Sequence, residues 1–95
     1  MKVDKKFHNV DTSRDDFEKK YLLILSENIQ RIRNERGLTL EKLGDKCNLT
    51  NNYLSKVCST SQPTHRVPSL NALLRIAFVL DITPEELFRE NTNPE

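Results

Sequence analysis

The sequence has little of what several classes of protein require. Its 95 residues include two Gly, two Cys and no Trp. Two Gly cannot form a glycine-rich phosphate loop, and the sequence contains neither a G-x-S-x-G nor an H-E-x-x-H motif. We therefore expect no enzymatic activity, no cofactor and no small-molecule substrate.

Cysteine and histidine are too few, and too irregularly spaced, for a metal site. Cys47 and Cys58 lack the C-x-x-C spacing of redox and zinc motifs, and together with His8 and His65 they fit no zinc finger. We expect two reduced thiols and no bound metal. A nucleophilic Cys58 is disfavoured, because the sequence shows no orienting acid or oxyanion site for it.

Long apolar runs are absent as well. No stretch approaches the roughly 18 apolar residues of a membrane helix, and the charged amino terminus lacks the apolar segment of a signal peptide. We therefore expect a cytoplasmic protein without a membrane partner. A chain of this length fits one domain, and because it lacks the alternating pattern of β-strands, the predicted fold class is all-α.

The net charge of +1 conceals an uneven distribution of charged residues. Between residues 28 and 68, seven basic residues stand against three acidic ones, whereas residues 81–95 contain one basic and five acidic residues. This polarity would orient the middle of the chain toward an anion such as nucleic acid. The alternative is that these charges only form ordinary solvated faces.

Apolar residues recur at helical spacing in five segments, which predicts a compact domain of five helices. The predicted helices span about residues 14–36, 40–47, 51–58, 69–80 and 84–90. Together they form a domain over residues 13–90, preceded by a polar arm at residues 1–12 and followed by a tail at residues 91–95.

Helix start and stop signals support these boundaries. The predicted N-cap residues are Ser13, Thr39, Thr50, Ser69 and Thr83. Gly37 is a natural residue to follow a helix end, and Asn48 tolerates the left-handed backbone of a tight turn between two helices. The helix at 69–80 is predicted to be largely buried through Leu70, Leu73, Leu74, Ile76, Ala77 and Leu80.

Two short helices joined across Cys47-Asn48-Leu49 have the proportions of a helix-turn-helix. The runs ENIQRIRNERGLTLEKLGDKCNLTNNYLSKV and PSLNALLRIAFVLDITPEELF closely resemble the phage-repressor and Cro (XRE) type of helix-turn-helix regulators. The resemblance covers about residues 25–88, and separate elements agree in order, namely ERGLT, YLSKV, PSL, LLRIAFVL and TPEELF.

This resemblance implies a five-helix repressor-like domain whose recognition helix begins at Thr50 and enters the major groove of double-stranded DNA. The residues it places at base edges are Asn51, Asn52, Ser55 and Lys56. The residues it places near the DNA backbone are Thr39, Thr50, Tyr53, Ser59, Ser61, Arg66 and Ser69. The alternatives are a core role for the Tyr53 ring, and ordinary capping or solvated-loop roles for the others.

The sequence departs from the family pattern at several positions. Leu40 replaces a common Gln that helps to clamp a phosphate, and Cys58 replaces a common Glu, so Arg33 loses its usual partner. Arg33 is then either satisfied by another group or free to contact phosphate. The connection at residues 59–67 is about four residues longer than usual. The added length costs little loop-closure entropy. The longer connection either reaches other phosphates or has no role.

We also predict a homodimer, because the apolar run Tyr21, Leu22, Leu23 and Ile24 covers more than one face of a helix. The alternative is that an arm containing Phe7 and Val10 folds back onto it. The predicted function is sequence-specific transcriptional regulation, by a prophage repressor, a restriction-modification controller or an antitoxin-like protein. The alternative function is a protein-interaction module that keeps the fold but has lost specific DNA binding.

Overall fold

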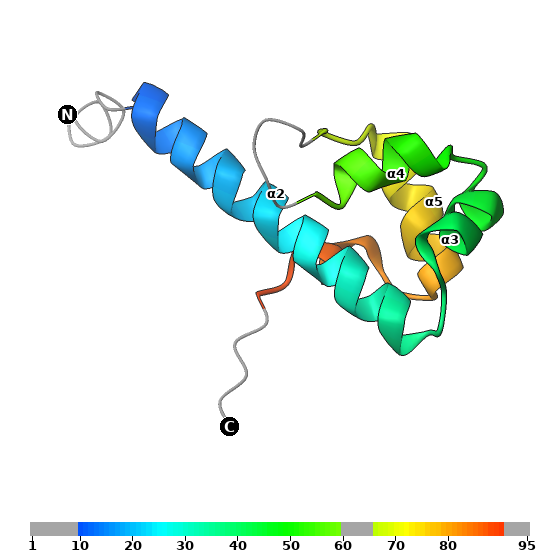
Figure 1. Ribbon diagram of the computed structural model, residues 1–95. Helices are drawn as coiled ribbons and strands as arrows, with labels where there is room; N and C mark the ends of the chain where they lie inside the picture. The colour runs from blue at the N-terminus through cyan, green and yellow to red at the C-terminus, as the bar shows by residue number, and fades with distance from the viewer. Residues whose placement is uncertain (1–9, 60–65, 91–95) are drawn as a thin grey trace.

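The computed structural model describes residues 10–59 and 66–90. The helices are α2 (Val10–Glu35), α3 (Leu40–Cys47), α4 (Asn51–Val57), α5 (Leu70–Leu80) and the 3-10 helix η1 (Pro84–Phe88) (Figure 1). The described residues contain no strand, which confirms the all-α prediction. No helix among them is long and apolar enough to cross a membrane.

The prediction of five α-helices was wrong, because the described part of the chain contains four. The last element is a 3-10 helix of five residues that begins at Pro84. Thr83 stands at its predicted N-cap position, but the Thr83 side chain makes no capping hydrogen bond. An element this short gains little from α-type hydrogen bonds, so the tighter i to i+3 pattern is preferred.

The predicted start of the first helix at Ser13 was also wrong. Helix α2 begins at Val10, so residues 10–12 belong to the helix and not to an arm, while residues 1–9 lie outside the described part. No Gly or Pro stands between Val10 and Ser13 to stop the helix from extending. The predicted end is confirmed, since Gly37 has a φ of 71° and the Leu38 N–H donates to the Arg33 carbonyl at 3.0 Å.

The core lies where α2, α3, α4, α5 and η1 converge. Its largest fully buried side chains are Leu25, Ile29, Leu43, Leu54, Val57, Ile76, Leu80 and Leu87. The amino-terminal half of α2 instead projects from this body, and residues 13–20 are all exposed (Figure 1).

The prediction that α5 is largely buried, with Leu70 and Leu74 among its buried residues, needs correction. Leu70 is 69% exposed and Leu74 is 46% exposed, whereas Ile76, Ala77 and Leu80 are buried. The sequence of α5 is apolar around most of its circumference, but only one face of it packs against the rest of the domain. The outward face is therefore apolar, and Phe78 on it is 84% exposed.

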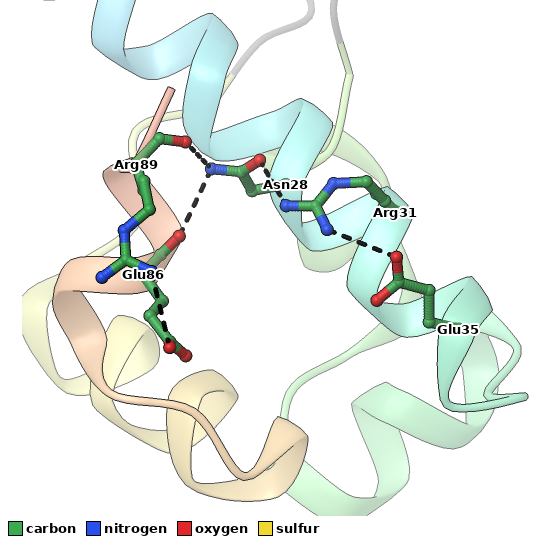
Figure 2. Close-up of polar contacts among 5 residues, drawn as sticks. All are labelled: Asn28, Arg31, Glu35, Glu86 and Arg89. Atoms are coloured by element: carbon green, nitrogen blue, oxygen red, sulfur yellow. Dashed lines mark hydrogen bonds and ion pairs between the residues drawn. The ribbon is translucent and has the colours of Figure 1, made fainter. Parts of the chain in front are cut away.

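Two buried polar side chains of α2 fasten other elements to it. The Asn28 amide donates to the Leu87 carbonyl at 2.8 Å. It also donates to the Arg89 carbonyl at 2.9 Å, and its oxygen accepts from Arg31 at 3.0 Å (Figure 2). The Ser26 hydroxyl donates to the Val57 carbonyl at 2.8 Å. These contacts satisfy polar groups that would otherwise be costly to bury.

Both cysteines are free and buried. Burial raises the pKa of the Cys58 thiol from an ordinary value of 9.0 to about 11, and the nearby Arg33 guanidinium opposes this shift. Burial likewise raises the pKa of Cys47. The folded protein therefore holds two neutral thiols of low reactivity at pH 7.

Alkaline pH should destabilise the fold through Cys58. Above pH 9 the unfolded chain loses this proton while the folded chain keeps it until about pH 11, so the free energy of unfolding should fall with rising pH. The contribution of this one group is up to about 1.4 kcal/mol per pH unit. Urea unfolding at pH 8.5, 9.5 and 10.5 measures it, and an equally steep pH dependence in Cys58→Ala would contradict it.

Candidate nucleic-acid interface

The turn between α3 and α4 sets the relative placement of the two helices. Asn48 caps α3 in the left-handed conformation, with a φ of 59°, as its sequence position predicts. The Leu49 N–H donates to the Gly44 carbonyl at 2.9 Å. A Cβ added at Gly44 would lie 2.7 Å from the Leu49 carbonyl oxygen. Gly44 therefore permits this close approach, a role that the sequence analysis did not assign to it.

The hydroxyl caps fix the first turn of three helices. Thr39 Oγ1 accepts from the Lys42 N–H at 3.0 Å, Thr50 Oγ1 from the Tyr53 N–H at 3.0 Å, and Ser69 Oγ from the Ala72 N–H at 3.1 Å. The predicted N-cap roles of Thr39, Thr50 and Ser69 are confirmed. A phosphate at the start of α3 or α5 would thus be met mainly by backbone N–H groups, not by these hydroxyls.

Helix α4 has one buried and one exposed side. Leu54 and Val57 are fully buried, which directs the opposite side of the helix to solvent. The side chains exposed there are Asn51, Asn52, Ser55 and Lys56. All four predicted base-contacting residues therefore share one polar, solvent-facing surface, which we call the reading face.

Tyr53 connects α4 with the segment that leads into α5. Its half-buried ring lies under the Arg66 guanidinium, 5.2 Å from the ring centre, and its hydroxyl accepts from the Ser69 N–H at 3.1 Å. The Arg66 N–H donates in turn to the Lys56 carbonyl at 2.9 Å. Three residues predicted near the DNA backbone, Tyr53, Arg66 and Ser69, are thus in contact beside the reading face.

Of the other two connection residues predicted near the DNA backbone, the structure describes one. Ser59 is half-buried just after α4, and Ser61 lies outside the described residues. His8 and His65 also lie outside them.

Arg33 forms hydrogen bonds to other groups, because position 58 has no acid. It donates to Gln30 Oε1 from two nitrogens, at 3.1 and 2.6 Å, and to the Leu38 carbonyl at 2.7 Å. Of the two alternatives drawn from the sequence, satisfaction by another group is the one observed. Leu40 is half-buried and packs against the core, so it does not replace the polar clamp of the family pattern.

The predicted dimer residues lie on α2, just before the core begins. Tyr21, Leu22 and Ile24 are half-buried, and Leu23 is 41% exposed. Tyr21 and Leu22 line an apolar pocket with Phe17, Val67 and Phe88 among its other walls. Part of the apolar surface of α2 for which the sequence predicted a partner subunit is therefore covered by other residues of the same chain.

A polar cleft of about 250 Å³ separates the carboxyl-terminal half of α2 from η1 and the residues that follow (Figure 2). Its charged walls are Arg31, Arg36, Arg89, Glu35, Glu86 and Glu90. Opposite charges alternate there, with Arg31 3.3 Å from Glu35 and Arg89 3.8 Å from Glu86. Because the charges balance, the cleft offers no net attraction to an anion.

The chain matches the helix-turn-helix family over residues 29–87, and it therefore belongs to that family, in the XRE type that the sequence resembles. The match begins within α2, so the projecting amino-terminal part of that helix precedes the shared domain. No curated protein sequence matches the chain significantly.

Two solved structures share the fold. The restriction-modification controller protein C.AhdI from Aeromonas hydrophila is 31% identical, with a TM-score of 0.63 over 70% of this chain and 96% of that one. The N-terminal DNA binding domain of SinR from Bacillus subtilis is 25% identical, with a TM-score of 0.64 over 75% of this chain and 99% of that one. Each compared structure is thus matched over nearly its whole length.

Gly44→Val should destabilise the domain by about 1 to 3 kcal/mol, because the added carbons must push the Leu49 carbonyl away from α3. Urea unfolding measures the change. Lys46→Val, at an exposed position of the same helix, is the matched control and should cost less than about 1 kcal/mol. Equal losses in the two variants would show that helix propensity, not the close turn, is responsible.

Proposed function

We propose that the protein is a sequence-specific DNA-binding transcriptional regulator of the cytoplasm, which reads the major groove with α4. The observation that carries this proposal is the reading face, where Asn51, Asn52, Ser55 and Lys56 are exposed together opposite a buried apolar side. The two structural neighbours, a restriction-modification controller and a DNA binding domain, support it.

The residue types of the reading face suit base recognition. An Asn amide presents a donor and an acceptor side by side, which match N6 and N7 of adenine in the major groove. Asn51 and Asn52 are in the first turn of α4, where side chains of this motif reach base edges. Lys56, one turn later, is a flexible point charge that we assign to a phosphate in preference to guanine.

The residues around the reading face would hold the DNA backbone. The N–H groups at the starts of α3 and α5 are suited to phosphate oxygens, and Arg66 adds a cation held close to α4 by the Tyr53 ring. Ser59 and Ser61 would add hydroxyls from the connection between α4 and α5. Such contacts set the register of the protein on DNA, while base contacts set its sequence preference.

Among the systems that such a regulator could serve, the likeness to C.AhdI favours control of a restriction-modification system over a prophage repressor or an antitoxin. We further propose that the protein acts as a homodimer, because a two-fold pair reads two half-sites about one turn of DNA apart.

The second candidate function is a protein-interaction module on the same fold. One observation favours it: Leu40 packs against the core in place of the usual polar clamp, so one phosphate contact of the family pattern is missing. The two functions differ in what they require of the reading face, since only the first needs it to discriminate between DNA sequences.

Binding to genomic fragments that flank the gene tests the proposal. Asn52→Ala should leave thermal stability nearly unchanged but reduce the preference for particular base pairs by about 1 to 3 kcal/mol. Lys56→Ala should weaken binding to all sequences and lower the salt slope by about one. The matched controls are Asn34→Ala and Lys19→Ala, at exposed positions of α2.

Wild-type affinity and selectivity in both α4 variants would show that α4 is not the reader. The interaction module would then be the better interpretation of the fold.

A further inference from the structure

The projecting half of α2 (Figure 1) forms one side of an apolar pocket of about 360 Å³. We call it the extension pocket, and its walls are Phe17, Glu18, Tyr21, Leu22, Val67 and Phe88. The four wall residues on α2 precede residue 29, where the match to the helix-turn-helix family begins. The pocket is therefore built partly from residues that the shared domain does not include.

The walls of the extension pocket are not needed to complete the core. Phe17 is 63% exposed and Val67 is 65% exposed, although both line the same apolar hollow. Neither belongs to the buried cluster of the domain or to the half-buried side chains packed against it. Apolar side chains gathered in this way on a small domain mark a surface that another molecule covers.

The size of the pocket favours a small molecule over a protein segment. Its volume of about 360 Å³ lies within the range of about 300 to 1,000 Å³ that is usual for small-molecule sites. Its six wall residues are far fewer than the roughly 20 to 30 residues that each partner contributes to a specific protein–protein interface.

Three aromatic rings, those of Phe17, Tyr21 and Phe88, line the pocket. The ring centres of Phe17 and Tyr21 are 4.9 Å apart, and the ring planes are inclined at 49°. The faces of such rings attract cations, because the π-electrons make them negative. The Tyr21 ring already has one cation near it, the Lys20 ammonium, which lies 5.4 Å from the ring centre.

A single carboxylate, that of Glu18, stands among these apolar walls. Within the described part of the chain Glu18 forms no ion pair. Lys20 does not neutralise it, because the Lys20 ammonium pairs with Glu90 at 2.8 Å. A carboxylate without a partner beside aromatic rings favours a positively charged ligand over a neutral or an anionic one.

We propose that the extension pocket binds a small apolar organic cation and serves as an effector site of the DNA-binding domain. The aromatic and aliphatic walls bury the apolar part of the ligand, and the Glu18 carboxylate lies beside its charge. Binding at the pocket goes beyond the proposed function and does not depend on it, whereas the effector role rests on it.

Val67 connects the pocket with the DNA-binding surface. It directly follows Arg66, whose guanidinium lies 5.2 Å from the centre of the Tyr53 ring and whose N–H donates to the Lys56 carbonyl at 2.9 Å. A ligand packed against Val67 stabilises the position of this segment beside the reading face. By linkage, the ligand and DNA should each strengthen the binding of the other.

Nuclear magnetic resonance titration of the full chain with benzyltrimethylammonium tests the pocket. The amide signals of Phe17, Tyr21, Val67 and Phe88 should shift and saturate at millimolar concentrations of this cation. Glu18→Gln and Phe17→Leu should each raise the dissociation constant about two- to fivefold, because each removes one attraction for the positive charge. Benzyl alcohol, which offers the ring without the charge, should bind more weakly.

Glu27→Gln and Phe78→Leu are the matched controls, since both residues are exposed and neither lines the pocket. They should leave the dissociation constant unchanged. Thermal melting of each variant confirms that the domain is folded. Signals that fail to saturate, equal binding of benzyl alcohol, or pocket variants that bind the cation as tightly as the controls would overturn the inference.

Binding to the preferred DNA fragment, with and without benzyltrimethylammonium, tests the effector role. The cation should tighten DNA binding by the wild-type chain more than by Glu18→Gln at the same concentration. A saturated pocket that leaves DNA affinity unchanged would overturn the effector role. A chain that binds the cation but shows no preference among DNA fragments would instead contradict the proposed function and leave the cation site intact.

Discussion

A helix of seven residues is too short to be stable by itself, so the position of the reading face depends on the contacts that hold α4. Leu54 and Val57 fix its inner side in the core, and Thr50 caps its first turn. The Val57 carbonyl at its end accepts from Ser26 of α2, while the Tyr53 hydroxyl accepts from the Ser69 N–H before α5. Helix α4 is therefore held at both ends and on one side by elements distant in the sequence.

Helix α2 connects these contacts with the rest of the domain. Ser26 and Asn28 are two residues apart. Ser26 binds a backbone carbonyl more than thirty residues away at the end of α4, and Asn28 binds carbonyls more than fifty residues away in η1 and directly after it. These bonds join a buried side chain to a main-chain oxygen, so they fix backbone position and not only side-chain orientation. Because α2 is a single continuous helix, the end of α4 and the carboxyl-terminal segment are positioned on one rigid element.

Local signals were predictable from the sequence, and tertiary ones were not. The caps at Thr39, Thr50 and Ser69 and the turn at Asn48 depend on residues within a few positions of each other. They were predicted correctly for that reason. The exposed face of α5 was not, because a helix apolar on most sides does not reveal which side its neighbours will cover.

The remaining differences have the same origin. The role of Gly44 depends on how closely the Leu49 carbonyl approaches, and the partners of Arg33 depend on how the α2 end meets the start of α3. Neither is encoded in a local pattern. The exposure of the reading-face residues follows from the burial of Leu54 and Val57 on the opposite side of α4.

Cys58 shows how the domain accommodates a departure from its family pattern. In that pattern an acid at this position would pair with Arg33 and connect α2 with the end of α4. Here the Cys58 thiol is buried and neutral. Arg33 instead donates hydrogen bonds to Gln30 and to the carbonyl of Leu38, the residue directly before the cap of α3. The connection between α2 and the end of α4 is kept by the neutral bond from Ser26 to Val57. The substitution therefore changes which groups hold the two helices of the motif, but leaves the exposed side of α4 untouched, so loss of the acid is no argument against DNA binding.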